Sequence, residues 1–271
     1  TSLARQKQWR VQKPVTAVGH PPPEIDFKIS NGQSASKNEF PFLVAIQEIG
    51  SYGKIFCGGC IVSDRHIVTV AHCMKQQPNP SKLIARVGDH DLSSDTESRY
   101  ARKHSIIQII NHPNHVGDYN DIALVLTRGS MEWSWGVAPI CLPFLDTGDT
   151  LAGYPVEIAG WGSVKFSGPT SDILLKGNLV IIENDRCNFF YNNTIADNQL
   201  CTYDPTGKGV DSWQMDSGGP VVLRKRERMF LVGIISYGIP FVQGLAIGVN
   251  TRITSHLDWI QSHIRNPLCV R

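Results

Sequence analysis

The sequence predicts an all-β chain with one convincing helix, close to the C-terminus. Its 271 residues include 24 glycines and 16 prolines, and short apolar runs alternate with these turn residues. That pattern favours short strands over alternating strands and helices. A chain of this length can bury a large core, as one domain or as two small ones. The pattern leaves a β-sandwich and a pair of barrels open.

Strand-like runs begin after residue 28 and continue through most of the chain. They include residues 42–46, 61–62, 67–70, 106–110, 122–126, 156–158, 178–182, 221–223 and 230–235. The predicted helix has an apolar face made of Ile253, Leu257, Ile260 and Ile264. Their spacing is helical, and Thr254 or Ser255 is placed to cap the first turn. Residues 1–28 lack such periodicity and hold three consecutive prolines at 21–23, which indicates a linker or pro-segment.

Composition excludes several classes of protein. Charged residues make up 18% of the chain and the net charge is +2, with basic residues scattered rather than striped, so a nucleic-acid partner is not expected. No apolar run approaches the roughly 18 residues that a membrane helix needs. The seven cysteines do not have zinc-site spacing, because Cys57 and Cys60 form the only short pair. With the glycosylation acceptor sequence at Asn192, they indicate a secreted, oxidised protein.

Three short motifs carry the chemistry. They are TVAHC around His72 at the end of a strand, NDIAL around Asp121 at the start of one, and DSGGP around Ser217 before another. A serine hydroxyl needs a base to take its proton, a histidine suits that task, and an aspartate fixes the histidine tautomer. Each residue alone has an ordinary structural explanation, but the order His, Asp, Ser with separations of 49 and 96 residues is specific.

Over residues 29–271 the chain resembles the chymotrypsin family of trypsin-like serine proteases. The resemblance implies two packed six-stranded antiparallel β-barrels with a C-terminal helix, the first at about residues 29–135 and the second at about 136–271. It also implies that His72, Asp121 and Ser217 form a catalytic triad and that Ser217 becomes an acyl-enzyme. The backbone N–H groups of Met215 and Ser217 would bind the oxyanion.

The resemblance further implies an inactive precursor and a basic specificity. The segment KISNG at 28–32 resembles an activation site, where cleavage after Lys28 frees Ile29 to pair with Asp216. Asp211 would lie at the base of the specificity pocket and bind a substrate lysine or arginine. The remaining pocket residues implied are Ser212, Ser236, Gly238 and Gly248.

The disulfide pairs are also implied by the resemblance. They are Cys57–Cys73, Cys187–Cys201 and, because residues 1–28 hold no cysteine for Cys141, Cys141–Cys269. Cys60 is left as a free thiol. The partners implied are proteins or peptides with Arg or Lys before the scissile bond, an activating protease and protein inhibitors.

Several positions depart from the family pattern. Met215 replaces the usual oxyanion glycine, and a bridge at the pocket entrance is lost together at Trp213 and Phe241. A second bridge that the resemblance implies is also absent, because Val156 and Leu223 stand at its two positions. Methionine at this position resembles arthropod venom and haemolymph proteases. These departures keep an alternative open, a catalytically weak homologue that acts as a binding or regulatory protein.

No cofactor is required by the predicted chemistry, and no metal ligand set stands out. The one cluster to consider is Asp89, Asp91, Asp95 and Glu97, near a loop that binds calcium in some relatives. Clustered carboxylates are usually a solvated loop, and a calcium site is the alternative.

Overall fold

The computed structural model describes residues 33–51, 54–94, 96–162, 170–206, 217–242 and 245–270, and strands dominate these ranges. The strands are β1 (Gln33–Ser34), β2 (Leu43–Glu48), β3 (Ile55–Ile61), β4 (His66–Thr69), β5 (Leu83–Val87), β6 (Arg102–Asn111), β7 (Ala123–Thr127), β8 (Cys141–Leu142), β9 (Pro155–Gly160), β10 (Leu175–Ile182), β11 (Gln199–Tyr203), β12 (Pro220–Lys225), β13 (Arg228–Val242), β14 (Leu245–Arg252) and β15 (Cys269–Val270). The helices are α1 (Ala71–Gln76), α2 (Asn184–Asn188) and α3 (Leu257–His263), with 3₁₀ turns η1 (Pro80–Lys82) and η2 (Ile253–His256).

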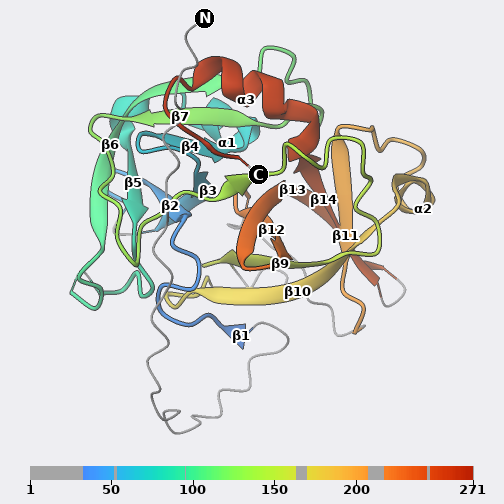
Figure 1. The fold of residues 1–271 in the computed structure, drawn as a ribbon, viewed down its shortest axis with the longest axis horizontal. Coiled ribbons are helices and arrows are strands. Elements are labelled where there is room, and N and C mark those ends of the chain that lie inside the picture. The colour runs from blue at the N-terminus through green and yellow to red at the C-terminus, as the bar shows by residue number, and fades with distance from the viewer. Residues whose placement is uncertain are drawn as a thin grey trace, which may run out of the picture.

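The first half of the chain forms a closed barrel with the strand order β2-β3-β4-β7-β6-β5 (Figure 1). Every neighbouring pair in this barrel is antiparallel. Val44, Ile46, Ile67 and Val68 are completely buried in it. Closure leaves no exposed sheet edge, and β-branched residues in the interior suit the pleated surface.

The second half forms another closed ring of six strands, β12-β9-β10-β11-β14-β13, because β12 also pairs with β13. Val156 on β9 and Leu223 on β12 are buried in its core, at a place where the resemblance implies a disulfide. Two apolar side chains pack there instead. The predicted pair of six-stranded antiparallel barrels is therefore confirmed, with β8 and β15 added in parallel at one edge.

The C-terminal helix is shorter than the pattern predicts. Residues 253–256 form the 3₁₀ turn η2, and α3 begins only at Leu257. Thr254 and Ser255 lie inside that turn, and the residue that precedes α3, His256, makes no side-chain capping bond. The predicted cap was wrong, but the predicted apolar face is buried.

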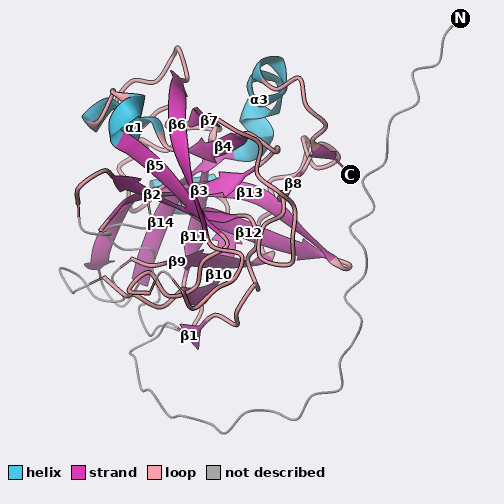
Figure 2. Cartoon of the chain, turned by 90° about the vertical axis from the view of Figure 1, so that its left-hand side faces the viewer, coloured by secondary structure: helices cyan, strands magenta, loops and turns pink. Residues whose placement is uncertain are grey.

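Although α3 follows the second barrel in the chain, it packs on the first. Ile253, Leu257, Ile260 and Ile264 belong to the same buried cluster as the interior of the first barrel. Figures 1 and 2 both show α3 beside β7. The helix therefore joins the two halves. None of the helices in the described ranges has the length and hydrophobicity needed to cross a membrane.

Three cysteine pairs form disulfides, and they are the pairs that the resemblance implies. Cys57 on β3 joins Cys73 on α1, Cys187 joins Cys201, and Cys141 joins Cys269. The last bridge links the neighbouring strands β8 and β15. Cys60 is free and completely buried, and this burial raises the pKa of its thiol far above the ordinary range.

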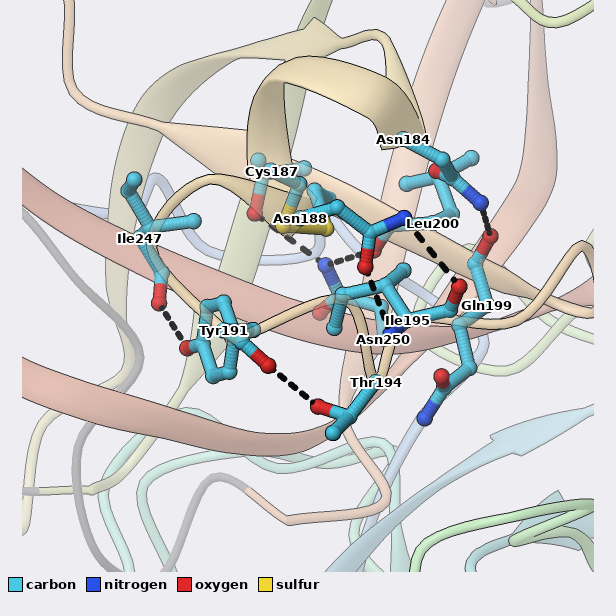
Figure 3. The surroundings of a disulfide bond; sticks show 12 residues. Asn184, Cys187, Asn188, Tyr191, Thr194, Ile195, Gln199, Leu200, Ile247 and Asn250 are labelled. Carbon is cyan, nitrogen blue, oxygen red and sulfur yellow. Dashed lines mark hydrogen bonds between the residues drawn. A yellow bond between two sulfur atoms is a disulfide. The ribbon is translucent and has the colours of Figure 1, made fainter.

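The loop after α2 is held by the Cys187–Cys201 bridge and by hydrogen bonds around it (Figure 3). The Tyr191 hydroxyl donates to the Ile247 carbonyl at 2.7 Å, and the Thr194 hydroxyl donates to the Tyr191 carbonyl at 2.6 Å. These bonds satisfy polar groups in a loop that has little regular structure.

We expect the Cys187–Cys201 bridge to contribute substantially to stability. Replacing both cysteines with alanine should lower the free energy of unfolding by about 3 kcal/mol, because the bridge closes a loop of about 15 residues in the unfolded chain. Urea denaturation measures this loss. Cys60→Ala, which removes a buried thiol but no cross-link, is the control and should lose less. A loss below about 1 kcal/mol in the double variant, the typical effect of one ordinary substitution, would contradict the expectation.

Candidate active site

His72 lies on a short helix rather than at the end of a strand. Strand β4 ends at Thr69, and His72 is the second residue of α1. Six residues are too few for a helix to be stable alone, so packing must hold it. Ala71, Cys73 and Met74 are buried, and the disulfide from Cys73 fastens α1 to β3. The His72 side chain remains 33% exposed.

Asp121 is 2% exposed and receives hydrogen bonds from both barrels. Its Oδ2 accepts from His72 Nδ1 at 2.7 Å and from the Ser236 hydroxyl at 2.6 Å. Its Oδ1 accepts from the His72 backbone N–H at 2.8 Å. Burial raises the pKa of the Asp121 carboxyl, but the hydrogen bonds and charge of His72 and the Ser236 bond outweigh it, and the net pKa is lowered. Asp121 is therefore an ionised acceptor.

The chain around Asp121 is fixed by residues that the sequence did not single out. The Thr251 hydroxyl donates to the Asp121 carbonyl at 2.7 Å. Asn120 adopts a left-handed conformation with φ +51°, which asparagine tolerates better than most residues. Asn198 donates to Asn120 Oδ1 at 2.8 Å, and His256 Nε2 lies 3.2 Å from the same oxygen. Nothing in the local pattern reveals these contacts, because the partners are far apart in the chain.

Ser217 lies just before β12, against the first barrel. Its carbonyl accepts from the Gly58 N–H at 2.8 Å. The next residue, Gly218, has φ +87°, and a Cβ there would overlap the Gly58 carbonyl and the Thr69 hydroxyl. Glycine is therefore required at position 218. Because Thr69 is three residues before His72, this close approach places the Ser217 segment beside the segment that carries the histidine.

Several expected site residues lie outside the described residues. They are Lys28, Ile29, Asp211, Ser212, Met215 and Asp216, together with Trp213 and Asp95. Of the expected pocket residues that are described, Gly238 on β13 and Gly248 on β14 are direct cross-strand partners. Ser236 points its hydroxyl at Asp121 and thus contacts the candidate triad.

Two of the three described carboxylates of the expected calcium loop are paired with side-chain cations, whereas Asp91 accepts hydrogen bonds from Ser93. Asp89 pairs with Arg86, and Glu97 Oε2 lies 2.7 Å from Lys37 Nζ. Glu97 Oε1 accepts from the backbone N–H groups of His90 and Asp91. Among the described residues no group of His, Cys, Asp or Glu has the arrangement of a metal site. The residues described here do not fit calcium, because the negative charges of Asp89 and Glu97 are already paired with Arg86 and Lys37.

One buried histidine, His256, and one half-buried histidine, His112, lie close to the segment that leads to Asp121. His112 and His256 meet edge to face, with ring centroids 5.3 Å apart, and the His112 ring lies 5.1 Å from the Trp259 ring. Burial lowers the pKa of His256, and burial with repulsion from neighbouring histidines lowers the pKa of His112. Both rings are therefore stabilised in the neutral form.

We expect stability to fall as the pH drops below about 6.5, the ordinary histidine value. A histidine whose folded-state pKa is lowered is protonated more readily in the unfolded chain, so acid favours unfolding. Urea denaturation at pH 7 and pH 5 should show a smaller free energy of unfolding at pH 5. The carboxylates whose pKa is lowered, such as Asp121 and Glu39, contribute only at lower pH, below their unfolded values.

His112→Phe should reduce this difference between pH 7 and pH 5, because it removes one half-buried ring whose pKa is lowered in the folded state. The matched control is His263→Gln, since His263 is exposed. An unchanged pH dependence in His112→Phe would contradict the assignment.

The sequence matches the Trypsin family over residues 29–260. It is 35% identical over 240 residues to a venom serine protease of Polistes dominula, covering 87% of this chain and 84% of that protein. It is 33% identical to Trypsin-1 of Astacus astacus, covering 87% of this chain and 99% of that protein. Venom serine protease 34 of Apis mellifera is 38% identical over 87% of this chain, but the chain spans only 58% of its length.

The fold has a solved counterpart in the serine protease neuropsin of mouse brain. The TM-score is 0.72 and the identity is 27%, over 86% of this chain and 98% of neuropsin. The paired barrels and the matched family together define a trypsin-like serine endopeptidase, a hydrolase. The chain belongs to the trypsin family, and its relatives include venom, melanization and clotting proteases of arthropods.

Proposed function

We propose that this protein is a secreted zymogen, activated by cleavage after Lys28, that hydrolyses peptide bonds after arginine or lysine. Its triad is His72, Asp121 and Ser217. The observation that carries the proposal is the hydrogen bond between His72 Nδ1 and the buried Asp121 carboxylate, beside the Ser217 segment.

The His72–Asp121 contact supports a definite protonation state. Because Asp121 is ionised it can only accept, so the proton between the two groups belongs to His72 Nδ1. His72 Nε2 then carries the lone pair that takes the proton of the Ser217 hydroxyl. The Ser217 oxygen attacks the peptide carbonyl, and the protonated His72 delivers the proton to the leaving amine. Water then hydrolyses the acyl-enzyme by the same base, and Asp121 stabilises the imidazolium in both steps.

Activation and specificity depend on residues outside the described ranges. In the proposal, the new amino group of Ile29 pairs with Asp216 and orders the backbone N–H groups of Met215 and Ser217 as the oxyanion site. Asp211 binds the substrate cation, with Ser212 beside it, and Gly238 and Gly248 leave room for a long side chain. Residues 29–271 form the protease domain, and residues 1–28 are the pro-segment. An activating protease and protein inhibitors are its expected partners.

Secretion is supported by the three disulfides and by the venom relatives. We assign Asn192, which is exposed, as a glycosylation site. The alternative of a catalytically weak binding protein is not favoured, because the pairing of His72 with Asp121 is retained.

Active-site labelling tests the proposed mechanism. After cleavage by a trypsin-like activator, the new N-terminus should be Ile29, and a serine-directed phosphonate should label Ser217 in a one-to-one ratio by mass spectrometry. Ser217→Ala should take no label and lose activity by roughly 10⁶-fold, as loss of the nucleophile does in a comparable triad. A folded chain with the correct new N-terminus that takes no label would refute the proposed function.

Substitution of Asp211 tests the specificity. Asp211→Ser should lower the preference for arginine over phenylalanine before the scissile bond by roughly 10⁴-fold, the discrimination that a polar pocket group can provide. The ratio of kcat/KM for two matched peptide amides measures it. Asp118→Ser, which removes an exposed carboxylate from the segment between β6 and β7, is the control. Unaltered arginine preference in Asp211→Ser would show that another residue binds the substrate cation.

A further inference from the structure

The glycosylation acceptor sequence at Asn192 lies in a loop that contacts the segment carrying Asp121. This loop runs between α2 and β11 of the second barrel, and its Thr194 carbonyl accepts from the Tyr119 hydroxyl at 3.0 Å. Tyr119 belongs to the segment between β6 and β7 of the first barrel, two residues before Asp121. The hydrogen bond therefore spans the boundary between the two barrels, where the proposed triad also lies.

The same loop contacts the strands of the proposed specificity pocket. The ring of Tyr191, which precedes the acceptor asparagine, meets the Tyr237 ring edge to face with centroids 6.0 Å apart. Its hydroxyl donates to the Ile247 carbonyl (Figure 3). Tyr237 on β13 precedes Gly238, and Ile247 on β14 precedes Gly248, the two residues proposed as pocket walls. The loop therefore borders both the triad segment and the proposed pocket.

The attachment point is fixed, although the loop has little regular structure. The Cys187–Cys201 bridge joins the two ends of the loop. Within it, the Asn193 N–H donates to the Asn188 carbonyl at 3.0 Å, and Asn188 Oδ1 accepts from the Ile195 N–H at 2.8 Å. A group attached to this loop is therefore held in one place relative to the active site.

The Asn192 side chain is placed to carry a bulky group. Asn192 and Asn193 are exposed and have φ +51° and +58°, left-handed values that asparagine tolerates better than most residues. They form a turn at the surface, between the buried residues Tyr191 and Ile195. With Thr194 they make the tripeptide that accepts an N-linked glycan.

We propose that a glycan on Asn192 restricts the active site to short or extended peptide segments and slows its reaction with folded proteins. The inference rests on the proposed function, because it needs both the triad and the pocket between Gly238 and Gly248. An N-linked glycan is bulky and hydrophilic and stays at the surface. Attached to this loop, it occupies space beside the active site.

The size of the partner decides whether this space matters. A folded substrate or inhibitor covers about 800 Å² of the surface of its partner, whereas a few residues of extended chain cover far less. An interface that is centred on His72 and the pocket has to extend over the bordering loop. A short peptide does not reach that far, and the glycan takes no part in the chemistry.

The test uses the full chain, secreted from insect cells and activated, with active-site concentrations fixed by phosphonate labelling. One substrate is an arginyl peptide, and the other is the same peptide displayed in an exposed loop of a folded carrier protein. Asn192→Gly removes the attachment point and tolerates the left-handed backbone. The matched control, Asn193→Gly, makes the same change one residue later and keeps the acceptor sequence.

Mass spectrometry should find a glycan on Asn192 in the wild type and in Asn193→Gly. In Asn192→Gly we expect kcat/KM for the displayed peptide to rise by about tenfold, within the range over which association rates vary among variants of one interface. For the free peptide, kcat/KM should not change. Enzymatic removal of the glycan from folded wild-type protein should give the same gain without a substitution.

Three results would overturn the inference. They are an unmodified Asn192 in the secreted protein, a gain for the displayed peptide no larger than that for the free peptide, and an equal gain in Asn193→Gly. If the protein takes the phosphonate label in the same experiment, these results refute only the role of the glycan. A folded chain with the correct new N-terminus that takes no label refutes the proposed function instead.

Discussion

Asp121 holds a negative charge where water hardly reaches, and the rest of the site is arranged to make that charge stable. A buried carboxylate is costly unless hydrogen bonds and nearby positive charge compensate for it. Here the compensation comes from α1 through His72 and from β13 through Ser236, while β14 anchors the backbone through Thr251. The first element belongs to one barrel and the other two to the second. The carboxylate is therefore satisfied only when the two barrels are packed together.

Because Asp121 needs hydrogen-bond donors from both barrels, the two barrels must pack closely against each other. The Ser217 segment approaches β3 until only glycine fits at position 218, and the N–H of Gly58 bonds the Ser217 carbonyl. From the other end of the chain, α3 and η2 pack on the first barrel, where His256 contacts Asn120 next to Asp121. Each half of the chain thus holds the proposed catalytic residues of the other half in place.

The cross-links of this chain differ from the family pattern, and at one place apolar packing stands where a disulfide is implied. The bridge between Cys141 and Cys269 lies within the protease fold, and residues 1–28 contain no cysteine. Where another bridge is implied, Val156 and Leu223 are both buried in one core cluster. Apolar burial can replace a cross-link here because both side chains point into a closed barrel.

The sequence by itself determined the three short motifs, with them the resemblance to the family, and the apolar face of the last helix. The barrel pair and the cysteine pairs were implied by that resemblance, because local alternation of apolar and polar residues leaves a β-sandwich open as well. The sequence did not predict the helix that carries His72 or the true start of α3, since both depend on packing more than on local propensity. Only the tertiary structure decided that Thr251 and His256 lie around Asp121 and its neighbour. Chain segments that no local pattern relates bring these residues there. Their positions are important because the Asp121 charge is buried and must be stabilised by its neighbours.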